Sequence, residues 1–243
     1  MKAYSNVLIA GLAFIITGWI IAGAYKYRVT STETIVVTGL AEKDFTSDLI
    51  VWKGRFNRYG FDLKQAYAAI KQDEKEIRQY LTQKGIPDSS IVISSIDVQK
   101  NFDTKYDDAG RVAGSSFSGY TLSAEVKVNA SDLVLVERVS REVTELLQKG
   151  IEFNSERPAY YYSKLNELKI DLLAKAAEDA KLRAETIAKN SKAGLGSLKK
   201  ANMGVFQITG KNDNEDYSYG GSFNTSSKEK TASITLRVEY LVK

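Results

Sequence analysis

The chain contains neither cysteine nor histidine in its 243 residues, and these two absences exclude several kinds of chemistry. Without cysteine there is no disulfide, no thiolate metal ligand and no attachment point for a bacterial lipoprotein anchor. Without histidine there is no Ser-His-Asp triad, and the usual general base near neutral pH is missing. We therefore predict a protein that is not an enzyme, with no catalytic, cofactor-binding or metal-binding residues.

An excess of charge of one sign is also lacking. The chain has 34 basic and 30 acidic residues mixed along its length, for a net charge of +4. A nucleic-acid-binding surface would need a basic patch or stripe, so we predict no nucleic-acid partner. The hydrophobic content of 43% is ordinary for a globular protein, and the length permits one large domain or two small ones.

One long uncharged run stands at the N-terminus, over residues 7–24. Its 18 apolar or small residues fall within the length that a membrane-spanning helix needs. We predict that 1–24 is an uncleaved, single-pass membrane anchor, that 25–32 is a tether, and that 33–243 is the folded domain. The alternative is a signal sequence cleaved after Ala24, because Ala22-Gly23-Ala24 fits a cleavage site.

The rest of the chain alternates between strand and helix patterns. Their periodicity predicts an α+β fold, with helices packed on a mainly antiparallel sheet. From 48 to 154 the order is β-α-β-β-α-β, which is ferredoxin-like, and a long helix and two strands follow. The predicted strands are 33–39, 48–57, 91–102, 120–128, 151–154 with 159–162, 203–209 and 232–242. The predicted helices are 62–85, 131–150 and 163–191.

The helix over 163–191 is predicted to be the packing spine of the domain. It contains no Gly or Pro, with Ser163 as its expected N-cap and Gly194 as its expected stop. Its apolar residues recur three or four positions apart and so share one face. Much of that face is alanine, and small side chains let a helix lie close to a sheet. The residues of this face are Leu165, Leu168, Leu172, Ala176, Ala180, Ala184, Ile187 and Ala188.

Two groups of acidic and amide residues are candidate calcium ligands. Asp103, Asp107 and Asp108 lack the alternate spacing of an EF-hand, and a solvated hairpin loop over 103–116 is the favoured interpretation. Asn212, Asn214 and Asp216 do alternate, but Tyr217 stands where the loop glycine belongs. The segment 210–227 is therefore predicted to be a polar loop.

Exposed aromatic residues are the other candidates for a binding surface. Tyr217, Tyr219 and Phe223 lie in that polar loop, where they would contact a neighbouring subunit or stay mobile. Tyr160, Tyr161 and Tyr162 form a run, for which we favour one or two residues in the core and one exposed over an interface or a glycan-contacting surface. The Gly194-Leu195-Gly196 turn follows a helix, which favours a helix C-cap over a nucleotide loop.

Taken together, several segments resemble the SIMPL-domain family of bacterial envelope proteins. These are 35–39 with Ala41-Glu42 and Asp48, the helix end at 81–86, Gly119-Tyr120, Gly150-Ile151, and the alanine-rich helix running into Leu195-Gly196. The resemblance covers about 33–243. It implies an α+β domain that is exported across the inner membrane into the periplasm or cell envelope, so that the anchor over 1–24 would lie in the inner membrane and 33–243 in the periplasm. It also implies ring-like or channel-like homo-oligomers, with some members linked to stress tolerance and no established catalytic residues.

Three functions compete on these grounds. The first is a membrane-tethered, self-associating envelope scaffold, held by strand edges or helix faces, with the membrane contacted through 7–24 and an envelope protein as a further partner. The second is a soluble periplasmic module that binds a ligand or partner after signal cleavage. The third is a carboxylate hydrolase, which would need two facing carboxyl groups in a cleft.

Overall fold

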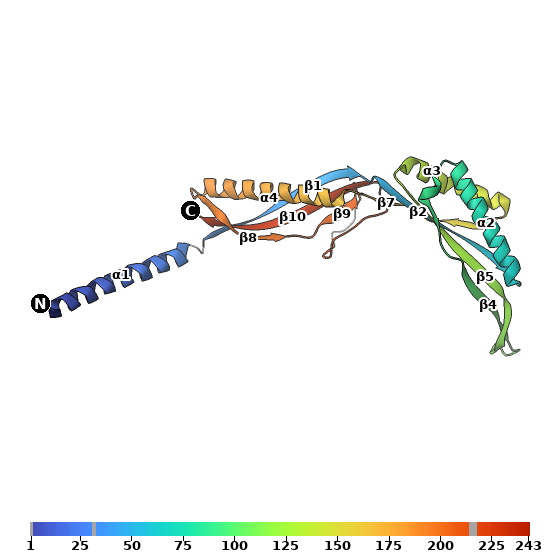
Figure 1. Ribbon diagram of the computed structural model, residues 1–243, viewed down its shortest axis with the longest axis horizontal. Helices are drawn as coiled ribbons and strands as arrows, with labels where there is room; N and C mark the ends of the chain where they lie inside the picture. The colour runs from blue at the N-terminus through green and yellow to red at the C-terminus, as the bar shows by residue number, and fades with distance from the viewer. Residues whose placement is uncertain (1, 31–32, 214–217) are drawn as a thin grey trace.

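The computed structural model describes residues 2–30, 33–213 and 218–243, and within the first helix it describes the side chains of 11–25. The part that follows this helix is elongated and has two lobes (Figure 1). The terminal lobe contains the first and last strands, and the inserted lobe is formed by the chain between them. Each lobe has its own sheet and its own buried core.

The N-terminal segment is helical, as predicted, over α1 (Lys2–Thr30). The helix continues through most of the predicted tether at 25–32, of which 31–32 lie outside the described residues. Within the part of the chain that the structure describes, no helix is long and apolar enough to cross a membrane. The transmembrane helix predicted over 7–24 is therefore not confirmed, and the side chains of 7–10 lie outside the description.

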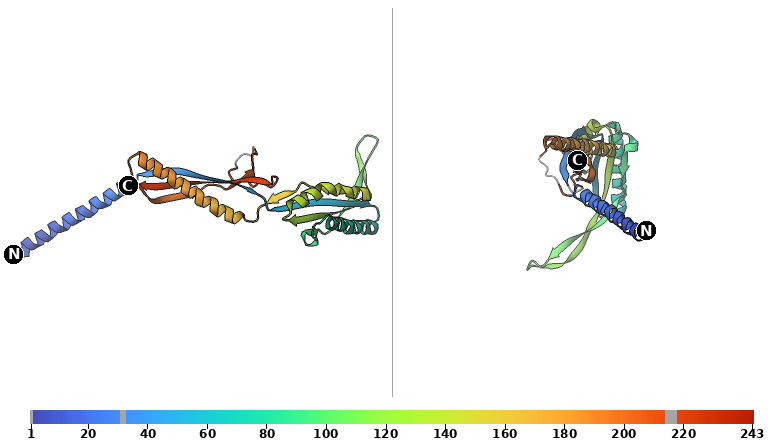
Figure 2. Two further views of the ribbon diagram at one scale, coloured as in Figure 1. Left: turned by 90° about the horizontal axis from the view of Figure 1, so that it is seen from above. Right: turned by 90° about the vertical axis from the view of Figure 1, so that its left-hand side faces the viewer.

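The terminal lobe is a two-layer structure of one antiparallel sheet and one helix (Figure 2). Its sheet order is β1-β10-β8, and β9 also pairs with β10. The first strand therefore pairs with the last along its whole length, from Thr34 opposite Leu241 to Thr46 opposite Glu229. The elements are β1 (Thr34–Thr46), β8 (Leu195–Met203), β9 (Gln207–Gly210), β10 (Glu229–Val242) and the covering helix α4 (Leu165–Asn190).

Helix α4 is the predicted spine. Six of the eight predicted face residues are buried, whereas Leu165 is half-buried and Ile187 is exposed. The small face lets α4 come close to β1 at Gly39, where an added Cβ would lie 2.1 Å from the carbonyl oxygen of Ala176. The core formed with the sheet also includes Val37, Ala41, Ile208, Ala232, Ile234, Leu236 and Val238.

Both predicted ends of α4 need correction. The N-cap is Lys164, because the hydroxyl and amide of Ser163 are bonded to Asp48 instead. At the other end Lys192 takes the left-handed conformation, and Gly194 pairs with Lys243 through two backbone hydrogen bonds. Gly196 is needed for β8, since a Cβ there would lie 2.6 Å from the carbonyl oxygen of Leu241.

A carboxylate on α4 protects the free edge of β1. The Oδ2 atom of Asp179 accepts a hydrogen bond from the backbone N–H of Leu40 at 2.9 Å and one from Arg183 Nε at 2.8 Å. An unpaired N–H on an edge strand otherwise invites pairing with another chain. The Leu40 N–H, and after it Arg183, hold the pKa of the Asp179 carboxyl below its usual value.

This lowered pKa predicts an acid-sensitive contact between α4 and β1. A carboxyl whose pKa is lower in the folded state stabilises the fold above its unfolded pKa of about 3.9, and the contribution is lost as the pH falls through the folded value. Asp179→Asn keeps an acceptor for Leu40 but does not titrate, so its stability should fall less between about pH 5 and pH 2. Thermal unfolding over this range tests this, with Glu185→Gln on the same helix as the control that keeps the wild-type profile. Identical profiles for Asp179→Asn and wild type would contradict the prediction.

The inserted lobe has a larger sheet of order β3-β5-β2-β6, in which neighbouring strands are antiparallel. Strand β4 also pairs with β5, and β7 also pairs with β2. The strands are β2 (Leu49–Gly60), β3 (Ile91–Ile93), β4 (Asp97–Tyr106), β5 (Val112–Ala130), β6 (Phe153–Ser155) and β7 (Ala159–Tyr161). The helices are α2 (Leu63–Gln83), α3 (Leu133–Glu142) and the short 3-10 helices η1 (Asp88–Ser90) and η2 (Val143–Lys149).

Both helices cover the same face of this sheet. Alternate residues of β2 and β5 point into the core beneath α2 and α3, with Trp52, Phe56 and Leu122 fully buried. The helix starts follow local capping. Asp62 accepts from the backbone N–H of Gln65 at the start of α2, and Asp132 accepts from that of Leu135 at the start of α3.

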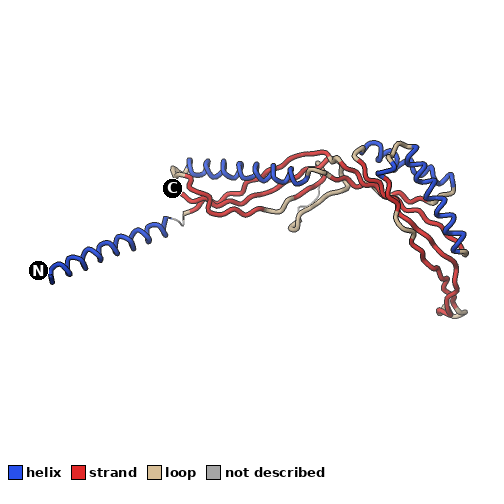
Figure 3. The backbone as a smooth tube through the Cα atoms, viewed as in Figure 1, coloured by secondary structure: helices blue, strands red, loops and turns tan. Residues whose placement is uncertain are grey.

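The α+β class with mainly antiparallel strands is thus confirmed, whereas the predicted six-element order is not reproduced one for one. The strand expected over 91–102 is divided into β3 and β4 (Figure 3). The hydroxyl of Ser94 accepts the backbone N–H of Glu125, so a side chain interrupts the ladder at that point. The helix expected over 131–150 is divided into α3 and η2, and the strand expected over 203–209 is replaced by β8 and β9.

The chain crosses between the lobes twice, from β1 to β2 and from β7 to α4, and Asp48 ties the two connections together. Its carboxylate accepts from Ser163 N at 2.7 Å and from Ser163 Oγ at 2.6 Å. The tyrosine run lies here and is divided between the lobes. Tyr160 packs on the inserted core and donates to Glu137, whereas Tyr162 packs on Phe45 of the terminal lobe.

Candidate functional site

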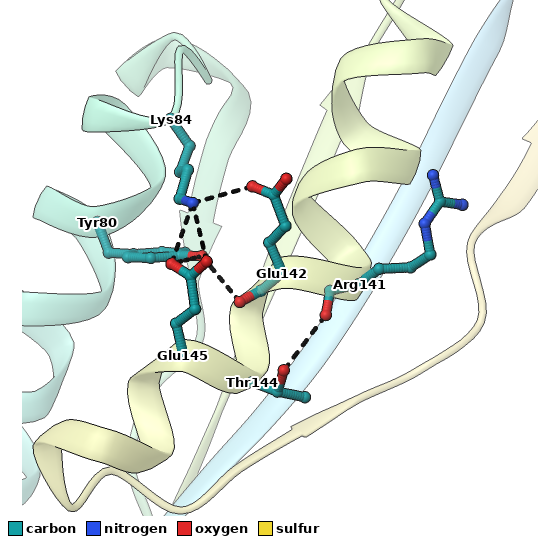
Figure 4. Close-up of polar contacts among 6 residues, drawn as sticks. All are labelled: Tyr80, Lys84, Arg141, Glu142, Thr144 and Glu145. Atoms are coloured by element: carbon teal, nitrogen blue, oxygen red, sulfur yellow. Dashed lines mark hydrogen bonds and ion pairs between the residues drawn. The ribbon is translucent and has the colours of Figure 1, made fainter.

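Three surface features were compared as candidate sites. The first is a charged cluster between α2 and η2, shown in Figure 4. The Nζ atom of Lys84, at the end of α2, lies 2.9 Å from Glu142 Oε2 and 3.0 Å from Glu145 Oε2. The hydroxyl of Tyr80 lies 3.0 Å from the carbonyl oxygen of Glu142 and 3.1 Å from Glu145 Oε2. Arg141 extends away from this group.

The single positive charge of Lys84 lies between the carboxyl groups of Glu142 and Glu145. Glu142 and then Glu145 raise the pKa of Lys84 above its ordinary value. Lys84 in turn holds the pKa of Glu145 below the ordinary value. Lys84 and Glu145 are therefore both ionised at neutral pH, and neither is suited to exchange a proton there. The cluster borders a groove of about 520 Å³, but its geometry is that of an ion-pair clamp between two helices.

The carboxyl groups of the chain bear on the carboxylate-hydrolase hypothesis. A general acid in such an enzyme needs a carboxyl group whose pKa is raised. In the described part of the chain, every carboxyl group with a resolved pKa shift is shifted downward, by hydrogen bonds to basic groups, hydroxyls or backbone N–H groups. These groups are Asp44, Glu145, Asp171, Asp179 and Glu239.

The second feature, which we call the sheet groove, lies on the face of the terminal sheet opposite α4. It has a volume of about 580 Å³ and is lined by β1, β9, β10 and the loop after β9. Gln207 fixes this loop by donating to Ser218 O at 2.8 Å and accepting from Ser222 N at 2.7 Å. The lining residues are Leu40, Glu42, Val205, Gln207, Ser218, Tyr219, Ser233, Ile234 and Thr235.

The third feature, which we call the arm, is the hairpin of β4 and the first half of β5, residues 97–123. It projects away from the inserted lobe beyond its helices (Figures 1 and 2). Toward its tip the apolar side chains are exposed, by 57% for Phe102, 65% for Tyr106 and 68% for Val112. The rings of Phe102 and Phe117 lie 6.0 Å apart, and those of Phe117 and Tyr120 lie 5.0 Å apart.

The model of the SIMPL family, described as a protein of unknown function (DUF541), matches residues 35–240. The chain belongs to the SIMPL family. Comparison with curated proteins finds none that matches it. The SIMPL match spans both lobes, so the arm, the sheet groove and the junction all belong to the family region.

The first group of acidic residues considered as calcium ligands, for which a loop is the favoured interpretation, occupies the arm of this SIMPL protein. Asp103 lies on β4, whereas Asp107 organises the hairpin turn by accepting from Ala109 N and Arg111 N. Across the residues that the structure describes, no three acidic side chains converge as a metal site would require. In the second group, Asn214 and Asp216 lie outside the described residues, as does Tyr217.

The remaining aromatic candidates differ in their surroundings. Tyr219 is fully exposed at the sheet groove, while Phe223 lies 6.4 Å from Tyr161 near the junction. Sequence reasoning missed the arm, because its polar and glycine-containing residues at 103–116 were interpreted as a loop. The available signal was the spacing of Phe102, Tyr106, Val112 and Phe117 on either side of the Asp107–Gly110 turn.

Proposed function

We propose that this SIMPL protein is a non-enzymatic, self-associating scaffold of the bacterial cell envelope. The observation that carries this proposal is the arm, a two-stranded ribbon with exposed apolar side chains. A hairpin with no covering layer is marginally stable in water, so a second protein surface would stabilise it. The absence of histidine and cysteine and the lowered carboxyl pKa values support a role without catalysis.

The proposed location is the periplasmic side of the inner membrane. Its support is the family resemblance and the uncharged sequence of 7–24, which would hold the scaffold at the membrane. Tethering many copies to one surface would raise their effective concentration, so that weak contacts between lobes suffice for assembly. A ring-like or channel-like assembly with a role in envelope stress tolerance is the form that the family resemblance favours.

The alternative is a soluble periplasmic module that binds a ligand. The observation that favours it is the sheet groove, whose volume falls in the range of small-molecule sites and whose polar side chains include Gln207 and Ser233. On this alternative the N-terminal segment would be removed after Ala24. The groove would then take a small apolar molecule or a peptide segment.

One experiment separates the two functions. Full-length protein is extracted from membranes in mild detergent. Light scattering then measures the mass of the assembly, and intact mass spectrometry measures the mass of the single chain. We expect a defined multimer of the 26.9 kDa chain that retains Met1. A monodisperse monomer at high concentration would overturn the scaffold proposal, and a monomer beginning at Tyr25 would favour the binding module.

A further inference from the structure

The end of the arm is its most exposed part. Tyr106 is paired with Val112 across the hairpin, and about two thirds of each side chain is exposed. The segment between them turns tightly, with Asp107 accepting from Arg111 N at 2.8 Å and Gly110 at a φ of 74°. The tip therefore presents two adjacent apolar side chains on a short, well-defined turn.

The charges of the tip balance. Over 105–112 the two basic residues, Lys105 and Arg111, are matched by Asp107 and Asp108. Burying this tip against another surface would therefore carry no net charge out of water, although each charged group would have to stay at the rim. The apolar pair of Tyr106 and Val112 would supply the favourable burial.

The sheet groove offers a surface of matching character. Leu40 and Val205 are apolar residues exposed by 43% and 45% at its walls, and Tyr219 projects from the adjoining loop. Its volume of about 580 Å³ is sufficient for several side chains. Ser233 and Thr235 line it as well and provide hydroxyl groups for the phenol of Tyr106.

The arm and the groove lie on different lobes. The arm leaves the inserted lobe at the end remote from the terminal lobe, whereas the groove lies on the terminal sheet (Figure 1). The arm of one chain is thus too far from the groove of the same chain to fill it. A contact between these two surfaces has to join two copies.

We infer that the arm tip of one copy seats in the sheet groove of the next. This inference rests on the proposed self-association and names its interface. The contact is heterologous, because each copy gives an arm and receives another through a different surface. Such contacts build a ring where the rotation between copies closes, and a filament where it does not.

The lack of cysteine makes a direct test possible, since single thiols can be placed in an otherwise thiol-free chain. Tyr106→Cys and Val205→Cys are made in two chains of different tag length, which are mixed, reassembled and oxidised. We expect a disulfide-linked pair that contains one chain of each kind. It should be at least tenfold more abundant than the pair formed when Ile170→Cys replaces Val205→Cys. Ile170 is exposed by 71% on α4 and serves as the matched control.

A second measurement uses charge instead of a cross-link. Tyr106→Asp with Val112→Asp should reduce the light-scattering mass of the assembly to that of the monomer, while Ile170→Asp should leave it unchanged. The substituted side chains are already largely in water, so folding should persist. Circular dichroism of each variant checks this point.

The outcomes separate the two levels of the argument. If the wild type is a multimer but the tip and groove thiols link no more often than the control pair, self-association stands and the arm–groove contact is wrong. If the aspartate variants remain multimeric, the contact is likewise wrong. If the wild type is a monomer, the proposed scaffold function fails and this interface fails with it.

Discussion

Replacing Gly39 by alanine is expected to destabilise the terminal lobe by about 3 kcal/mol or more, at the upper end of overpacking effects. The added Cβ would lie 2.1 Å from the carbonyl oxygen of Ala176 and 2.7 Å from the amide nitrogen of Ala180. Both atoms belong to the backbone of α4, so no side-chain rotation relieves the collision. The helix would have to move away from β1, which would open the core along its alanine face.

Urea or thermal unfolding of Gly39→Ala measures this effect, and Gly220→Ala is the control. A Cβ at Gly220 meets no atom closer than the Ser218 hydroxyl at 4.0 Å. A second comparison adds Ala180→Gly to Gly39→Ala. This removes the Ala180 Cβ, which lies 2.8 Å from the new atom, but leaves the backbone of α4 in place. We therefore expect little recovery. A loss below about 1 kcal/mol in the single variant would show that α4 adapts easily.

This close approach shows what the sequence can and cannot predict. The alanine stripe of α4 predicts a helix that lies near its partner, because its spacing and small side chains are local properties. The partner itself, Gly39, lies far away in the chain, and nothing in its neighbourhood marks it as the contact. The pairing of β1 with β10 likewise depends on a contact between the two ends of the domain.

The arm and the two-lobe arrangement were missed for a related reason. The segment 103–116 is polar and contains two glycines, which locally favours a loop. In the structure it forms a hairpin because β4 and β5 pair from Asp97–Ser123 to Tyr106–Val112. The tyrosine run at 160–162 was predicted to be partly in a core, yet the sequence does not indicate that its two ends serve different cores.

A buried ion pair in the inserted lobe was also missed, although its signal was present. On α2 the apolar residues Ile70 and Ile77 share one face, and Asp73 lies between them at helical spacing. Asp73 is 3% exposed and accepts two hydrogen bonds from Arg58 on β2, one of them from Nη2 at 2.6 Å. An acidic residue within an apolar stripe indicates a paired charge, and the pair raises the pKa of Arg58.

We expect the two halves of this pair to differ when each is removed alone. Arg58→Leu should cost about 3–5 kcal/mol, since it leaves the carboxylate of Asp73 buried without its partner. Asp73→Leu should cost less, about 2 kcal/mol, because the Arg58 side chain is 32% exposed and its guanidinium can turn into water. The order of the two losses follows from the burial of the charge that remains.

The double variant Arg58→Leu/Asp73→Leu completes the cycle and should lie within about 1 kcal/mol of the wild type, because two leucines can replace the pair between α2 and β2. Denaturant unfolding of all four proteins gives the coupling energy. Lys71→Leu, which removes a more exposed ion pair with Glu74 on the same helix, is the control with a smaller effect. Equal losses for the two single variants would contradict the asymmetry. Calorimetry of two of these variants also reports whether the lobes unfold together, because Gly39 lies in the terminal lobe and Arg58 in the inserted lobe. If the lobes share one unfolding transition, its temperature should fall in both Gly39→Ala and Arg58→Leu. If each lobe has its own transition, each variant should shift only the transition of its own lobe.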